Sequence, residues 1–146
     1  MVSKQGQKAS RQGKKFEDMI AGMLDTAGAE YHTQVTLEGG SIFGKDKRID
    51  FLITNQDKYP EGLYLELKWQ DSNGTVEEKM PYTVACIKER YDKPTALVLG
   101  GDGITKGCEQ WVFDQEGGNL VRVMYESEIV RFCMRNGFTN LPEFLK

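Results

Sequence analysis

RIDFLITNQDKYPEGLYLELKWQ, the segment from Arg48 to Gln70, carries the strongest structural pattern in this chain. From residue 63 onward, apolar and polar side chains alternate without a break. The apolar set is Leu63, Leu65, Leu67 and Trp69, and the polar set is Tyr64, Glu66, Lys68 and Gln70. Strict alternation predicts a half-buried β-strand, with Glu66, Lys68 and Gln70 together on one face.

A second strand is predicted just before this one, over residues 49–53, where Asp50 lies between apolar neighbours. The segment 55–62 between the two strands is rich in turn-forming residues, which favours a hairpin. If that hairpin is symmetric about Lys58, Asp50 lies directly opposite Glu66. Two carboxylates then face each other across neighbouring strands.

Opposed side chains in an antiparallel pair lie roughly 5 Å apart at Cβ, where like charges repel. Such a pair of carboxylates persists if it shares a proton, if a basic residue intervenes, or if a divalent cation lies between the two groups. Lys68 follows on the same face and neutralises part of the charge. A hard cation such as Mg²⁺, bound by carboxylates, waters and a substrate phosphate, fits equally well.

The overall composition indicates one soluble globular domain of 146 residues with a net charge of −3. The charge is unevenly distributed, because residues 1–15 contain five basic groups and no acid. The remaining residues, 16–146, carry 14 basic and 22 acidic groups. We therefore divide the chain into a basic N-terminal arm, 1–15, and a single domain, 16–146. The arm is either a phosphate contact or a solvated terminus.

The cysteines and the single histidine exclude several classes of site. Cys86, Cys108 and Cys133 are odd in number and form no C-x-x-C pair, which argues against a disulfide framework and a structural zinc site. With His32 as the only histidine, a His-dependent triad or zinc hydrolase is also disfavoured. The chain has no apolar run long enough for a bilayer and no hydrophobic signal core. We expect a cytoplasmic protein of a bacterium, an archaeon or a phage-infected host.

Hydrophobic spacing predicts the other elements. The first helix runs from Phe16 to Ala27, carries Glu17 at the edge of its apolar stripe, and ends at Gly28. A strand over 31–37 and a Gly- and Lys-rich loop, expected to be a mobile hairpin tip or a nucleic-acid contact, follow. The later expected elements are a helix over 76–91 with a Thr75–Glu78 capping box, a buried strand over 95–99, a short helix or turn over 108–113, a strand over 120–124, a helix capped by Ser127 that runs through Arg135, and a docked end at 141–145. The expected fold is α/β, a mixed sheet with helices on its faces.

The order helix, three strands, helix, strand, together with these residues, resembles the PD-(D/E)XK nuclease superfamily and its restriction-endonuclease-like αβββαβ core. The matching motif is Ile49-Asp50, fifteen further residues, and then Glu66-Leu67-Lys68, with Ile49 where proline is typical. The start of the first helix is similar to that of archaeal-type Holliday junction resolvases, through Gly13, Lys14, Phe16 and Glu17.

The resemblance implies metal-dependent hydrolysis of phosphodiester bonds. It implies that Asp50, Glu66 and the Leu67 carbonyl hold Mg²⁺, or Mn²⁺ in its place, and that Lys68 orients a water molecule and stabilises negative charge on the phosphate. Glu17 is then expected in the shell of a second metal, and Gln70 as a hydrogen-bond partner of the water or of a metal ligand.

These expectations describe an endodeoxyribonuclease that acts on DNA as a homodimer, since one small chain offers one active site and duplex cleavage needs two. Restriction, nicking and junction resolution all remain open. One alternative is a DNA-binding module on a nuclease fold that lacks activity, although such a module has no chemical reason to keep Asp50, Glu66 and Lys68. Another is a protein-interaction subunit of a larger complex.

Overall fold

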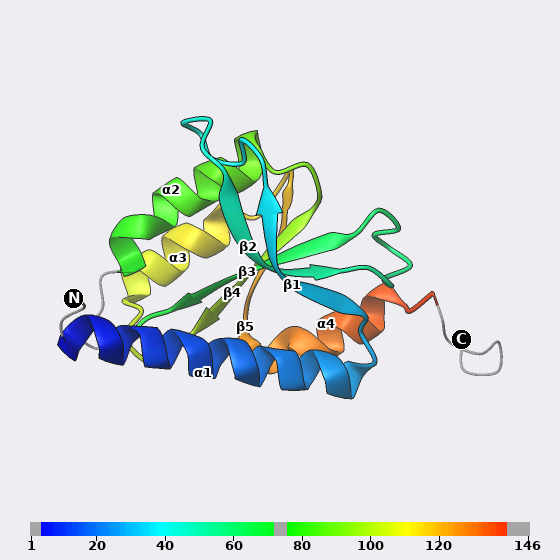
Figure 1. Cartoon of the computed structure of the whole chain (residues 1–146), viewed down its shortest axis with the longest axis horizontal. Coiled ribbons are helices and arrows are strands. Elements are labelled where there is room, and N and C mark those ends of the chain that lie inside the picture. The colour runs from blue at the N-terminus through cyan, green and yellow to red at the C-terminus, as the bar shows by residue number, and fades with distance from the viewer. Residues whose placement is uncertain (1–3, 72–75, 140–146) are drawn as a thin grey trace.

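The computed structural model describes residues 4–71 and 76–139, which form a five-stranded sheet with helices on both faces (Figure 1). The chain order confirms the predicted αβββαβ core and the smaller elements that follow it. The elements are α1 (Lys4–Ala27), β1 (Tyr31–Leu37), β2 (Lys47–Ile53), β3 (Leu63–Trp69), α2 (Val76–Glu89), β4 (Thr95–Gly100), α3 (Lys106–Asp114), β5 (Leu120–Tyr125), the 3₁₀ turn η1 (Glu126–Glu128) and α4 (Ile129–Asn136).

The sheet is mixed, with strand order β1-β2-β3-β4-β5. The first three strands are antiparallel, and β3, β4 and β5 run parallel to one another. In the β2–β3 hairpin, Phe51 pairs with Leu65 and Ile53 pairs with Leu63. This register is symmetric about Lys58, as the sequence predicted. Helix α2 makes the crossover from β3 to the parallel strand β4, and α3 makes the crossover from β4 to β5.

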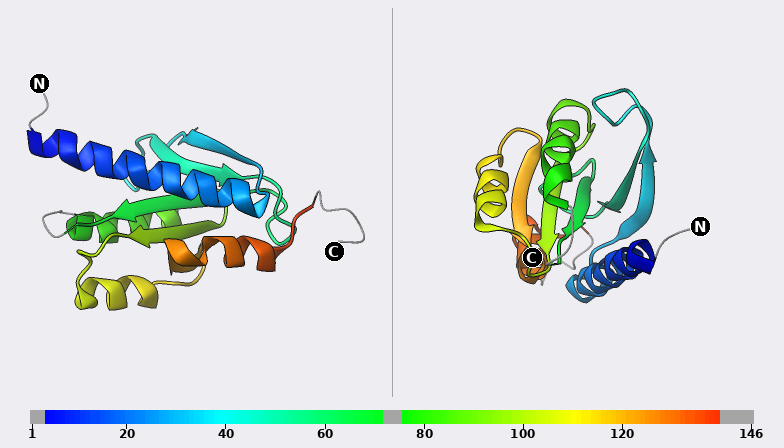
Figure 2. Two further views of the ribbon diagram at one scale, coloured as in Figure 1. Left: turned by 90° about the horizontal axis from the view of Figure 1, so that it is seen from below. Right: turned by 90° about the vertical axis from the view of Figure 1, so that its left-hand side faces the viewer.

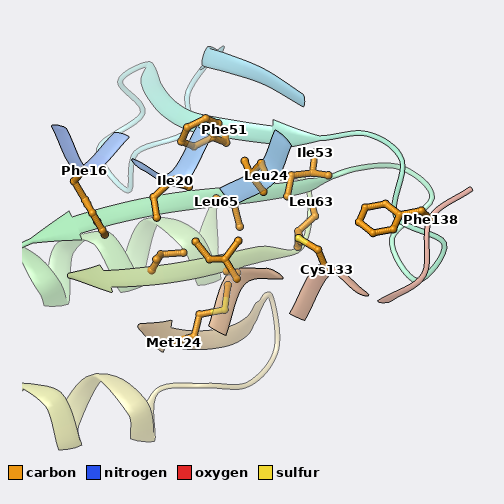
Figure 3. Close-up of a cluster of buried hydrophobic side chains, with 13 residues drawn as sticks. Phe16, Ile20, Leu24, Phe51, Ile53, Leu63, Leu65, Met124, Cys133 and Phe138 are labelled. Atoms are coloured by element: carbon orange, nitrogen blue, oxygen red, sulfur yellow. The ribbon is translucent and has the colours of Figure 1, made fainter. Parts of the chain in front are cut away.

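Each face of the sheet carries its own apolar cluster. Helices α1 and α4 cover one face, and α2 and α3 cover the other (Figures 1 and 2). Figure 3 shows the α1-side cluster, to which β3 contributes Leu63 and Leu65, while Tyr64 of the same strand belongs to the α2-side cluster. Every residue of β4 is buried, as expected of a strand covered on both faces.

The polar face of β3 is less exposed than its sequence predicts. We expected Glu66 and Gln70 on a solvated face, but Glu66 is only 3% exposed and Gln70 only 4%. The reason is tertiary, because α2 packs over this face of the sheet and covers the end of β3. The interpretation of β3 as half-buried was therefore wrong for these two residues, and both need hydrogen-bond partners inside the protein.

The apolar alternation of β2 breaks at Asp50. We expected Ile49 and Phe51 on the same face, yet Ile49 packs into the α2-side cluster and Phe51 into the α1-side cluster. Opposite Asp50 on β1 lies Gln34, whose φ of 53° is left-handed. The β1–β2 ladder forms on both sides of this point but not at it. At Gln34 and Asp50 the β1–β2 hairpin therefore departs from regular strand alternation, and the β2 side chains on either side of Asp50 face opposite sides of the sheet.

Helix α1 is longer than expected, because it begins at Lys4 and not near Phe16. Its first half is the segment that we expected to be a basic arm, and this half extends past the sheet (Figure 2). Phe16, Ile20 and Leu24 are buried, and Gly28, with φ 86°, ends the helix as predicted. The helical spacing of apolar residues also places Met19 in the predicted core stripe, and this was wrong because Met19 is 38% exposed.

One further expectation changed, at the start of α4. Ser127 does not cap α4, because it lies within η1 and Glu128 occupies the N-cap position without a side-chain hydrogen bond. Helix α2 runs through Pro81 without interruption. The predicted cap at Thr75 and the predicted docking of 141–145 fall outside the described residues. None of the described helices is long and apolar enough to cross a membrane.

Candidate active site

The candidate site lies at Asp50 on β2 and Glu66 on β3, where the backbone hydrogen bonds between these two strands stop and leave a gap in the ladder. The β2–β3 pairing runs from Ile53–Leu63 to Phe51–Leu65 and stops there, one residue short of Asp50 and Glu66. Asp50 instead uses its side chain, since its Oδ2 accepts a hydrogen bond from the Leu67 backbone N–H at 2.8 Å. A carboxylate thus replaces the backbone carbonyl that a continuing ladder would supply.

Glu66 reaches the same gap from β3. Its Oε1 accepts a hydrogen bond from the Asp50 backbone N–H at 3.3 Å. Its Oε2 accepts a hydrogen bond from the Tyr91 hydroxyl at 3.1 Å, inside the α2-side core. The two contacts fix the Glu66 carboxylate beside Asp50, although the pair does not form the simple cross-strand pair that the hairpin symmetry predicted.

Two lysines supply positive charge to this carboxylate pair. Lys68 lowers the pKa of both Asp50 and Glu66, and Lys47, at the start of β2, lowers that of Glu66. Within the described part of the chain, the ion pairs shorter than 4.0 Å are Lys14–Asp18 and Arg122–Glu128, so neither lysine is locked to a carboxylate. Glu66 and Lys68, both among the described residues, therefore do not form an ion pair within this distance.

Burial nevertheless dominates the titration of the pair. It raises the pKa of Asp50 above its usual value, against the Leu67 N–H and Lys68, which lower it. Burial and the Asp50 charge raise the pKa of Glu66 to about 7. Near neutral pH the pair therefore holds a proton part of the time, and a bound cation would displace that proton.

We predict that this arrangement makes the metal-free protein less stable as pH rises. The pKa of Glu66 goes from 4.5 unfolded to about 7 folded. The contribution of this group to the free energy of unfolding is fully present below pH 4.5. It is lost as pH rises toward and through 7, by about 3 kcal/mol. Urea unfolding in EDTA, measured at a series of pH values, should show this fall, and added Mg²⁺ should reduce it at neutral pH.

The matched variants for this prediction are Glu66→Gln and Glu61→Gln. Glu61 is exposed in the β2–β3 turn, so Glu61→Gln should leave the pH slope of wild type unchanged. Glu66→Gln removes the titrating group and should flatten the slope. An unaltered slope in Glu66→Gln would show that the pH dependence arises elsewhere.

Glu17 approaches the site from α1. Its charge raises the pKa of Asp50, and its Oε1 accepts a hydrogen bond from Gln34 Nε2 at 2.9 Å. The Gln34 amide also acts as a donor toward Asp50 and lowers its pKa. Gln34 thus connects Glu17 to Asp50 from a strained backbone position, and strain of this kind concentrates at functional sites.

Gln70 is engaged elsewhere. Its Oε1 accepts a hydrogen bond from the Val76 N–H at 2.6 Å, at the start of α2, and its Nε2 donates to the Asp71 carbonyl at 2.9 Å. These contacts join the end of β3 to the first residue of α2. They account for a buried glutamine at this position without any contact to a metal or a water molecule.

The donors at the gap fit a hard divalent cation. Asp50 and Glu66 supply carboxylate oxygens, and the Leu67 carbonyl leaves β3 on the same edge as the Leu67 N–H that Asp50 binds. An all-oxygen set of this kind suits Mg²⁺ or Mn²⁺. In residues 4–71 and 76–139 no cluster of three or more His, Cys, Asp or Glu side chains is placed to hold a metal. The candidate metal ligands are therefore the carboxylates of Asp50 and Glu66 and the Leu67 carbonyl.

Sequence reasoning missed three residues of this site. Tyr91 was taken as the end of an apolar helix stripe, Lys47 as part of a loop, and Gln34 as a polar strand residue. A hydroxyl on an apolar stripe gives no sign that it will meet a carboxylate 25 positions away in the chain. The left-handed conformation of Gln34 also lacks a local signal, since glycine or asparagine would be the usual choice there.

The fold and site together define a class of protein. A mixed sheet with an antiparallel hairpin, a parallel crossover and carboxylates at the hairpin gap is the restriction-endonuclease-like fold. A comparison with protein families matches residues 8–135 to the PD-(D/E)XK nuclease superfamily domain, so the chain belongs to this superfamily. Searches of curated proteins and of solved structures found no match.

Proposed function

We propose that this chain is a divalent-metal-dependent endodeoxyribonuclease that hydrolyses phosphodiester bonds of DNA. The observation that carries the proposal is the gap in the β2–β3 ladder, where the Asp50 and Glu66 side chains meet beside Lys68. Membership of a nuclease superfamily supports it. The same side chains would be costly to bury in a fold that served only as a scaffold.

The proposed roles follow from the contacts. Asp50, Glu66 and the Leu67 carbonyl hold Mg²⁺, or Mn²⁺ in its place. Mg²⁺ bound there supplies Lewis-acid polarisation of the phosphate and lowers the pKa of a bound water. Lys68, without an ion pair shorter than 4.0 Å among the described residues, is left to orient the attacking water and to stabilise charge on the phosphoryl oxygens.

The surrounding residues position this set. The Tyr91 hydroxyl orients Glu66 by the hydrogen bond to Oε2. Glu17, linked to Gln34, lies where its charge acts on Asp50, and we assign it to the outer edge of the metal site. We assign Gln70 to anchoring of the end of β3 and not to the chemistry, because both ends of its amide bind backbone groups.

Substrate contact is proposed for the basic half of α1. Arg11, Lys14 and Lys15 are exposed on this helix, which extends past the sheet on the side where β3 and β4 end (Figures 1 and 2). Cationic groups there neutralise DNA phosphates.

Because one chain offers one site, we also propose that two copies act together when both strands of a duplex are cut. Three unpaired cysteines suit a reducing, cytoplasmic location.

The test is a cleavage assay on supercoiled plasmid and on a synthetic four-way junction, with Mg²⁺, with Mn²⁺ and with EDTA. Cutting that requires the metal and stops in EDTA is expected. The substrate that is cut separates junction resolution from restriction or nicking. A folded protein that binds DNA but cuts neither substrate with either metal would indicate a binding module, and one that does neither would indicate a protein-interaction subunit.

A further inference from the structure

The tip of the β1–β2 hairpin carries the most exposed large hydrophobic side chain among the described residues. Phe43 is 74% exposed and contacts Tyr82 of α2. The ribbon shows the hairpin tip next to this helix (Figures 1 and 2). A single exposed phenylalanine is common on protein surfaces, so the inference depends on what surrounds this ring. Because the chain belongs to a superfamily of nucleases, a nucleic acid is a natural partner for this ring.

The loop that presents Phe43, which we expected to be a mobile hairpin tip or a nucleic-acid contact, is held by its own hydrogen bonds. The buried Ser41 hydroxyl accepts hydrogen bonds from the N–H groups of Phe43, at 3.2 Å, and Lys45, at 2.9 Å. The Asp46 carboxylate accepts another from the Gly39 N–H at 3.0 Å. The ring is thus presented at a defined place, and binding there costs little ordering entropy.

One face of the Phe43 ring is already used. It stacks on Tyr82 of α2 with ring centroids 5.9 Å apart and planes inclined by 20°. Lys47 lies over the same Tyr82 ring, with Nζ 5.3 Å from its centroid. Phe43, Tyr82 and Lys47 therefore form one assembly, which we call the aromatic platform, with a flat apolar face left open to solvent.

The aromatic platform adjoins the candidate active site. Lys47 belongs to it and also acts electrostatically on Glu66, so it links the stacked rings to the carboxylate pair. Lys47 lies at the start of β2, three positions before Asp50. Three strand positions separate Lys47 from Asp50, roughly 10 Å along β2, so a nucleic acid bound at the carboxylate pair can extend to the aromatic platform.

We propose that the open face of Phe43 stacks on an unpaired base of the nucleic-acid substrate, so that this protein favours single-stranded, flapped or branched DNA over continuous duplex. The inference rests on the proposed function and adds its substrate class. A flat exposed ring beside a lysine is the usual way to bind an unstacked base, because every base has a π-face. Bases inside a continuous duplex are stacked on each other and do not offer that face.

The experiment measures binding of the full chain, in EDTA so that nothing is cut, to a labelled single strand and to a hairpin duplex. Phe43→Ala should weaken single-strand binding by about tenfold, while duplex binding changes less than about twofold. Phe43→Tyr keeps a stacking ring and should bind as wild type does. Met134→Ala removes another exposed side chain, 55% exposed on α4, and should change neither affinity.

A single strand with abasic positions distinguishes a base contact from a backbone contact. Wild type and Phe43→Ala should bind that strand equally, because the ring then has nothing on which to stack. Equal weakening of single strand, duplex and abasic strand by Phe43→Ala would overturn the proposal. So would a change of Phe43→Ala from dimer to monomer in sedimentation, which would make the platform a protein interface.

The failures of the two proposals are distinguishable. If wild type cuts or binds DNA and Phe43→Ala behaves as wild type on every strand, the inference about the platform fails and the nuclease proposal stands. If wild type neither binds nor cuts any of these substrates, both proposals fail together. Phe43 is exposed, so Phe43→Ala should keep the thermal midpoint of wild type, and loss of folding does not confuse the comparison.

Discussion

Asp50→Asn and Lys68→Ala should each reduce metal-dependent cleavage by at least about 10³-fold while the protein stays folded. Asparagine keeps an oxygen that can accept the hydrogen bond from the Leu67 N–H, so the end of β3 remains anchored. It loses the negative charge that we assign to metal binding. Lys68→Ala removes the ammonium that we assign to the water and the phosphate, and it breaks no ion pair shorter than 4.0 Å among the described residues.

Activity and stability should change in opposite directions in Asp50→Asn. Burial raises the pKa of both groups, and the Asp50 charge also raises that of Glu66, so removal of the Asp50 charge relieves repulsion in the metal-free protein. We expect a gain of about 1 kcal/mol in the free energy of unfolding at neutral pH, in EDTA. This pairing of lost cleavage with gained stability is the signature of a functional carboxylate pair and not of a structural one.

The controls are Asp102→Asn, in the exposed loop before α3, and Lys88→Ala, exposed in the last turn of α2. Both should cut DNA as wild type does. Cleavage is measured as plasmid relaxation with Mg²⁺, and stability by urea unfolding. If both Asp50→Asn and Lys68→Ala kept wild-type cleavage, these residues would be removed from the mechanism.

The second large effect is expected at Gly101, which follows β4. Its φ of 89° is left-handed, and a Cβ at this position would lie 2.2 Å from the Gln70 carbonyl oxygen. That oxygen belongs to the backbone and accepts a hydrogen bond from the Gly103 N–H, so it cannot move aside cheaply. We expect Gly101→Ala to lose about 3 kcal/mol or more of stability, or not to fold.

This steric contact also bears on the site, because Gln70 follows Lys68 by two residues on the same chain segment. The Gln70 N–H donates to the Gly100 carbonyl at 3.1 Å, which holds the end of β3 against β4. If Gly101→Ala folds at all, its cleavage should fall with its stability. The measurement is urea unfolding beside the cleavage assay.

Gly22→Ala is the matched control for this substitution. Gly22 lies inside α1, and a Cβ there would meet no atom within 4 Å. Alanine is the better helix former, so this variant should gain about 0.5–1 kcal/mol. Equal stability of Gly101→Ala and wild type would contradict the close approach of Gly101 to Gln70.

The sequence by itself determined the elements and their order. The alternation of β3, the largely apolar sequence of β4 and the stripe of α1 reflect local burial, and the turn residues around Lys58 indicate the register of the β2–β3 hairpin. Backbone geometry gives side chains a period of 2 in strands and 3.6 in helices. Burial of one face then makes that period visible in neighbouring residues of the sequence. The D-x(15)-E-x-K motif, taken together with the order of the helices and strands around it, indicated the superfamily to which the chain belongs.

The tertiary structure alone decided the environment of the site. Burial of Glu66, its hydrogen bond from Tyr91, the turn of the hairpin at Gln34, the capping role of Gln70 and the stack of Phe43 on Tyr82 all depend on where α2 and the hairpin pack. These contacts join residues far apart in the chain, and no local period encodes them. Periodicity thus tells which face of a strand a residue occupies, while only packing tells what covers that face.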